Sequence, residues 1–217
     1  MSTILDVPLQ VREQRVLMNR VSWETYEGLL EAHADSSSPR ITYDHGMLEI
    51  MSPSTKHEEL KVVTASIVEL VAEEWGLEFK GLGSATFRRR ELEQGLEPDS
   101  CFYLQNVERI LTKEEIDLSV DPPPDLVIEI EITRPAVSKL PIYARLGVPE
   151  VWVADGQSVR ILGLLDDAYQ PSEHSQVLAP LTATVLSGFL ERSRTLKTLA
   201  WRRVVRDWAR QQRTHSD

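Results

Sequence analysis

The sequence has almost no cysteine and no long apolar run. Its 217 residues include one cysteine, Cys101, which excludes an intrachain disulfide and a cysteine-based zinc site. No apolar run approaches the roughly 18 residues that a membrane-spanning helix needs. The first residues, MSTILDVPLQVREQR, lack the basic and then apolar segments of a secretory signal. These absences predict a cytoplasmic protein that does not span a membrane.

The chain also lacks a net positive charge. The formal charge is −10, and residues 192–217 hold eight Lys or Arg against Asp207 and Asp217, a local +6 that leaves −16 on the first 191 residues. An acidic body argues against nucleic-acid binding driven by bulk charge. It does not exclude a nuclease, because carboxylates that bind metal ions contribute to the same negative charge. The basic C-terminal face is either solvated or a contact for phosphate or another subunit.

What the chain does have is alternating strand and helix patterns. Helical spacing predicts helices over residues 22–33, 54–76, 138–147 and 187–213, and the second of these has Thr55 and Glu58 at the spacing of a capping box. Period-two alternation predicts a hairpin over 39–53 and strands over 77–83, 84–89, 99–104, 125–133, 150–156 and 158–165. We therefore expect an α/β fold, a mixed sheet flanked by helices. The expected organisation is one domain over residues 1–190 and a basic C-terminal helix over 191–217, packed on the domain or extending from it.

Residues 121–133, DPPPDLVIEIEIT, place two acids inside an apolar strand. Glu129 and Glu131 are two residues apart, so their Cα atoms lie ~6.6 Å apart on one face of the strand. Burying two like charges costs several kcal/mol unless a partner compensates for them. A divalent cation would compensate, and the alternative is a strand whose polar face meets water.

Other polar residues lie in or next to predicted apolar strands. Asp99 follows a proline at the start of one strand, Glu49 lies inside the hairpin, and Lys139 opens the helix after the acidic strand. Carboxylates of this kind suit Mg²⁺, with Mn²⁺ as a substitute, and a lysine would stabilise charge on an attacked phosphoryl group. Ser84 and Thr86, on a strand that leads towards Asp99, are either ligand contacts or ordinary strand residues.

The segments ITYDHGMLEIMSPSTKHE, GLGSATFRRRELEQGLEPDSCFYL, PDLVIEIEIT and KLPIYARLGVPEVWVADG resemble the Uma-two family of restriction-endonuclease-like proteins, within the PD-(D/E)XK nuclease superfamily. The resemblance covers roughly residues 20–190. It implies a restriction-endonuclease-like fold, a Mg²⁺ site and hydrolysis of DNA phosphodiester bonds. It also implies that Asp99 and Glu129 are metal ligands, that Glu49 is an additional acid, and that His57 lies near the pocket, although a surface or capping histidine stays open.

One position departs from the superfamily pattern. Glu131 occupies the position where that pattern has a lysine, two residues after the second acid. Either Glu131 serves as a ligand or base, or Lys139 supplies the missing positive charge, and both can hold. If neither holds, the chain is a non-catalytic binding or assembly module with the nuclease fold. A glycosidase is a weaker alternative, because its two carboxylates flank a sugar from separated elements. A homodimer is compatible with the sequence.

Overall fold

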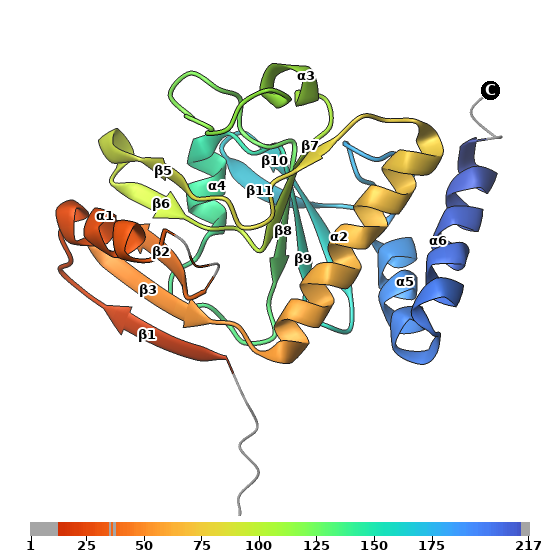
Figure 1. Ribbon diagram of the computed structural model, residues 1–217, viewed down its shortest axis with the longest axis horizontal. Helices are drawn as coiled ribbons and strands as arrows, with labels where there is room; N and C mark the ends of the chain where they lie inside the picture. Colours follow the sequence, from red (N-terminus) through yellow and green to blue (C-terminus); the bar gives the residue numbers. More distant parts are fainter. Residues whose placement is uncertain (1–12, 35, 37, 214–217) are drawn as a thin grey trace, which may run out of the picture.

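The computed structural model describes residues 13–34, 36 and 38–213, so the first twelve residues of the expected domain and the last four of the expected C-terminal helix lie outside it. The described residues form two β-sheets and six α-helices (Figure 1). This mixed α/β architecture confirms the expected fold class, but the sequence analysis expected one sheet. No helix in this part of the chain is long and apolar enough to cross a membrane.

The larger sheet carries the acidic strand near its centre. Its strands, in order across the sheet, are β11 (Ala168–Ser172), β10 (Val159–Leu165), β9 (Glu150–Ala154), β8 (Leu126–Ile130), β7 (Ser100–Tyr103) and β4 (Lys80–Gly81). The neighbours β8 and β9 run parallel and are joined through α4 (Leu140–Leu146), whereas the other neighbours run antiparallel. A parallel pair needs such a crossover connection, which places α4 against the sheet.

The two faces of β8 pack against different helices. Leu126, Ile128 and Ile130 belong to the apolar core formed with α2 (Thr55–Trp75), α5 (Ala183–Thr195) and α6 (Thr198–Arg213). Val127 faces the second core, which includes α4. Each fully buried aliphatic side chain contributes about 1.5–3 kcal/mol, so this alternation fixes the register of the strand. The predicted alternation is confirmed up to Ile130, where the strand ends.

The smaller sheet is antiparallel and is formed by the N-terminal part of the described chain. Its strands, in order, are β1 (Gln14–Met18), β3 (Met47–Ser52), β2 (Arg40–Asp44), β6 (Gln94–Leu96) and β5 (Phe87–Arg89), and a short 3-10 helix, η1 (Arg90–Leu92), joins β5 to β6. The helix α1 (Trp23–Ala32) packs on this sheet through Trp23 and Tyr26. The hairpin predicted over residues 39–53 is confirmed as β2 and β3, whereas β1 was not predicted.

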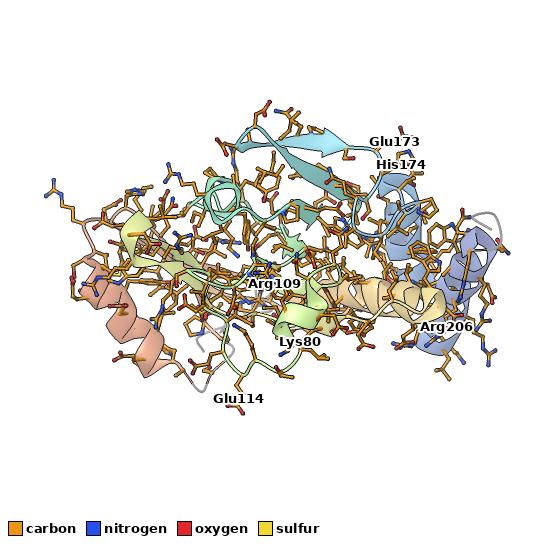
Figure 2. The ribbon with its side chains drawn as sticks, turned by 90° about the horizontal axis from the view of Figure 1, so that it is seen from above. Lys80, Arg109, Glu114, Glu173, His174 and Arg206 are labelled. Atoms are coloured by element: carbon orange, nitrogen blue, oxygen red, sulfur yellow. The ribbon has the colours of Figure 1, made fainter. Side chains whose placement is uncertain are left out.

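The strands predicted over residues 77–83 and 84–89 are much shorter than expected. Because β4 belongs to the larger sheet and β5 to the smaller one, the chain between them must cross over, and Gly83 turns there with a φ of 58°. Lys80 lies beside the loop of α3 (Val107–Ile110), where its ammonium donates to the carbonyls of Ile110, Leu111 and Lys113 (Figure 2). The side chain of Lys80 therefore holds the loop that follows α3, and β4 itself stays only two residues long.

The long helix α2 begins differently from the prediction. Its N-cap is Ser54, whose hydroxyl accepts a hydrogen bond from the amide of His57 at 3.2 Å, so the expected capping box of Thr55 and Glu58 is wrong. Glu58 instead binds the buried guanidinium of Arg40 at 2.6 Å. Tertiary pairing with a buried cation therefore overrides the local capping pattern.

The expected single helix over residues 187–213 is also wrong, because it is broken into α5 and α6. The backbone leaves the helix at Leu196, with ψ at 148°. The reversal lets the indole of Trp201 donate to the carbonyl of Phe189 at 2.9 Å and lets α6 pack on α2 (Figure 1). Burial of one face of each helix favours this hairpin over one long helix.

Candidate active site

The helix α4 binds the buried acid of β8. The Nζ of Lys139, at the N-cap of α4, lies 3.1 and 2.9 Å from the two carboxylate oxygens of Glu129. Tyr143 donates its hydroxyl to the same carboxylate from one helical turn further on. Burial, together with the charge of Glu129, raises the pKa of Tyr143 well above its ordinary value, so the phenol stays a donor. One face of α4 thus neutralises and orients Glu129.

Lys139 also connects α4 to the chain before β7. Its ammonium donates to the backbone carbonyl of Glu97 at 3.0 Å, and the carboxylate of Glu97 accepts from the hydroxyl of Thr86, also at 3.0 Å. Thr86 is exposed and lines a separate surface cavity of about 980 Å³, whereas Ser84 is half-buried between β4 and β5. Thr86 and Lys139 therefore both bind Glu97, which links Thr86 indirectly to the site.

Asp99 lies at the junction of the two sheets. Its neighbour Ser100 pairs with Ile128, so Asp99 lies beside Glu129 on the adjacent strand. The carboxylate is fully buried, and its Oδ2 accepts from the amide of Ile130 at 2.6 Å. Its Oδ1 contacts the guanidinium of Arg40. A buried carboxylate needs such partners, because an unpaired charge here would cost several kcal/mol.

His57 lies between Asp99 and the first described residue of the chain. Its Nε2 is 2.9 Å from Oδ1 of Asp99, and its Nδ1 is 2.5 Å from Oε1 of Glu13. Burial alone would raise the pKa of Glu13, but hydrogen bonds from His57 and Thr133 outweigh it and lower the pKa to about 2. His57 is therefore a fully buried bridge between two carboxylates, so a surface histidine is excluded.

Glu49 fixes the loop between β8 and α4. Its Oε2 accepts from the amides of Ala136 and Val137 at 2.6 and 2.8 Å, and its Oε1 binds the guanidinium of Arg15. Arg15 also donates to the side chain of Thr133 in the same loop at 3.1 Å. Because Lys139 follows this loop directly, Glu49 helps to set where Lys139 enters the site.

Glu131 has a different cationic partner from Glu129. It lies one residue beyond β8, and its carboxylate pairs with Arg160 of β10 at 3.2 Å. The Glu131 side chain is 36% exposed, against 10% for Glu129. The two acids that were expected to share one face therefore have different environments, because the strand ends between them.

A pocket of about 50 Å³ opens between these elements. Its lining includes Arg15, Glu129, Glu131, Ser138 and Lys139. The described residues contain no group of three or more His, Cys, Asp or Glu side chains arranged to hold a metal ion. The donor chemistry of Asp99 and Glu129 nevertheless fits Mg²⁺, which proteins hold through one or two carboxylates, with water and substrate phosphate completing the shell.

A family model described as "Putative restriction endonuclease", Uma2, matches residues 23–196. The chain belongs to the Uma2 family. Among solved structures, a putative nuclease belonging to DUF820 from Anabaena variabilis is similar at 17% identity and a TM-score of 0.48, over 71% of this chain and 93% of that one. No curated protein matches the chain. Membership of Uma2 confirms the family resemblance and makes this a nuclease-type fold with nucleic acid as the expected class of substrate.

Several residues at this candidate site were not found by sequence reasoning. Glu13 and Arg15 lie where no element was predicted, and Arg40 lies at the start of the predicted hairpin but was not singled out. The smaller sheet, with the residue before β1, brings all three to the site. Tyr143 was also not predicted as a site residue. Its spacing of four residues from Lys139 was the available signal, because that spacing puts both side chains on one helix face.

Proposed function

We propose that the chain is a Mg²⁺-dependent endonuclease that hydrolyses phosphodiester bonds of DNA, with Mn²⁺ as a substitute metal. The observation that carries the proposal is the contact of Lys139 with both oxygens of Glu129, at 3.1 and 2.9 Å. This contact means that a cationic side chain lies next to the acidic strand even though position 131 is not a lysine. Family membership supports the reaction class.

In this proposal Asp99 and Glu129 hold the metal. Asp99, directly before β7, lies beside Glu129 of β8 at the junction of the sheets, and both are carboxylates, which hard divalent cations prefer. The bound ion would polarise the phosphoryl group and activate water for attack. Arg40 and Lys139, which now neutralise the two acids, would be shared with the anionic substrate.

Lys139 supplies the positive charge in the absence of the motif lysine. Its side chain is 12% exposed and extends from the start of α4 to line the pocket. A fixed cation at this point stabilises charge that develops on the phosphoryl oxygens. Tyr143 holds the carboxylate of Glu129 from the opposite end of the same helical turn.

The other predicted site residues have supporting roles in this proposal. Glu49 orders the loop that precedes Lys139, and His57 orients Asp99. Glu131 would act as a ligand or base only after leaving Arg160. Thr86 would contact the substrate from the side of the larger cavity, and Ser84 would do so from the segment between β4 and β5. A domain over residues 1–190, a homodimer and a cytoplasmic location remain predictions from the sequence.

Cleavage of supercoiled plasmid tests the proposal. The wild type should produce nicked and linear DNA in Mg²⁺ or Mn²⁺, and Lys139→Ala should slow cleavage by about 10²–10³-fold, the size of effect expected for loss of one transition-state contact. Lys197→Ala is the matched control, because Lys197 is an exposed residue between α5 and α6. Calorimetry should give similar Mn²⁺ affinities for wild type and Lys139→Ala. Equal cleavage rates for the wild type and Lys139→Ala would contradict the role of Lys139.

One observation favours a second candidate, a non-catalytic binding or assembly module that retains the nuclease fold. In the described part of the chain, Asp99 and Glu129 are each bound by a cationic side chain, and Glu131 is paired away from them. A protein that binds Mn²⁺ weakly and leaves single- and double-stranded DNA intact under all metals would establish this alternative.

A further inference from the structure

The strand β1 is a sheet edge with exposed apolar side chains on both of its faces. Figure 1 shows it as the outermost strand of the smaller sheet. Val16, Leu17 and Met18 are 55%, 47% and 43% exposed, although successive side chains on a strand point to opposite faces. Met18 pairs with Leu48 of β3, which is buried in the core that α1 covers. That core therefore ends at β3 and leaves β1 largely uncovered in the described chain.

The other three sheet edges have features that discourage pairing with another strand. At the opposite edge of the smaller sheet, β5 has Arg88 and Arg89 among its three residues. In the larger sheet, β4 is only two residues long, and β11 contains Pro171, which has no amide hydrogen to donate. Charges, prolines and short strands are common means of keeping an edge from pairing with another chain. The sequence of β1, QRVLM, has no proline, and its one charged residue, Arg15, is already paired with Glu49.

A second copy of the same strand fits this edge. Two antiparallel copies related by a two-fold axis form a self-complementary interface. With the axis at Val16, the centre of the strand, Val16 faces Val16 of the partner subunit and Arg15 faces Leu17 of the partner subunit. No like charges are opposed across the strands, which matters because each chain has a net charge of −10 and two copies repel each other elsewhere. The edge offers no free charge to a charged strand, so its chemistry favours a copy of itself.

We propose that β1 is the interface of a homodimer, in which the β1 strands of two copies pair antiparallel about a two-fold axis at Val16 and join the two smaller sheets into one. This surface lies outside the matched family segment, which begins at residue 23. A strand of five residues is ~17 Å long, so the interface is small and the dimer depends on concentration. The proposal does not depend on the proposed function. Because β1 also carries Arg15, which lines the pocket at Glu129, the dimer places both pockets beside the joined strands.

Analytical ultracentrifugation of the full chain over a concentration series tests the proposal. The wild type should pass from monomer to dimer as the concentration rises. Val16→Lys should raise the dissociation constant of the dimer by about tenfold or more, because two like charges would then face each other at the axis. Val120→Lys is the matched control: Val120 is 70% exposed in the loop before β8, and this variant should associate like the wild type. Circular dichroism checks that each variant is folded.

A mixing experiment tests the register of the two strands. Val16→Glu should also weaken the dimer on its own, whereas an equal mixture of Val16→Lys and Val16→Glu should restore it, because opposite charges would then face each other at the axis. A mixture that associates as weakly as either variant alone would refute pairing about Val16.

Hydrogen exchange of the wild type gives a measure that needs no variant. Exchange of the β1 amides should slow as the protein concentration rises, because the second copy occupies the free side of the strand. A wild type that stays monomeric at its highest soluble concentration, or β1 amides whose exchange is independent of concentration, would overturn the proposal. A dimer that Val16→Lys leaves unchanged would place the interface elsewhere and would overturn it as well.

Discussion

Two groups of charged residues flank α2, and they differ in burial. The buried charge network (Glu13, Arg40, His57 and Asp99) lies at the N-terminal end of the helix, and the helix-surface ion pairs (Glu73, Glu74, Arg206 and Arg210) join its other end to α6. Figure 2 shows Arg206 on α6, beside α2. The side chains of Arg40 and Asp99 are 2% and 1% exposed, whereas Arg210 is 60% exposed.

The difference shows why similar ion pairs have different consequences. Surface pairs lie in a high dielectric and contribute about 0–1 kcal/mol each. A buried pair yields little net stability, but removing one partner is costly because the other charge stays desolvated. The buried charge network therefore fixes positions around Asp99, and the helix-surface ion pairs add slightly to the packing of α6.

Breaking the buried charge network should have the largest effect. Arg40→Met keeps much of the side-chain volume but leaves Asp99 without its guanidinium and leaves Glu58 paired only with Lys61, at 3.5 Å. We expect the free energy of unfolding to fall by about 3–5 kcal/mol. Urea denaturation followed by circular dichroism measures it. A loss below about 1 kcal/mol would show that this group behaves like the surface pairs.

Acid should weaken the buried charge network selectively through Glu13. Its pKa is about 2 in the folded protein, below the ordinary 4.5, so the stability it contributes is fully present above pH 4.5 and is lost as the pH falls towards 2. The difference in unfolding free energy between wild type and Glu13→Gln should shrink over this interval. Parallel stability curves for the two proteins between pH 5 and about 2.5 would contradict the lowered pKa.

Removing a helix-surface ion pair should have the smallest effect. Arg206→Gln loses contacts with Glu73 and Glu74, each at 2.6 Å, on a side chain that is 31% exposed. We expect a loss of less than about 1 kcal/mol in the free energy of unfolding, and this loss should diminish further in 1 M salt because the charges are screened. A loss comparable to that of Arg40→Met would remove the contrast between the two groups.

Glu129 and Glu131 show how far sequence patterns reached into the site. The alternation correctly put Leu126, Ile128 and Ile130 on one core and Val127 on the other. It could not predict that the strand would end before Glu131, because the end is set by pairing with β9 and by the contact with Arg160. Likewise, the local motif at Thr55 was overridden when Glu58 found a buried arginine.

The sequence by itself determined the core of the α/β fold, the family, and the placement of Asp99 and Glu129 in apolar strands, because these depend on periodicity and short motifs. Only the tertiary structure decided which cation accompanies each acid. Lys139 reaches Glu129 because α4 returns across the sheet, and Glu13 reaches His57 because β1 adds to the edge of the other sheet. Such contacts join segments distant in the chain, and packing rather than local pattern brings them together.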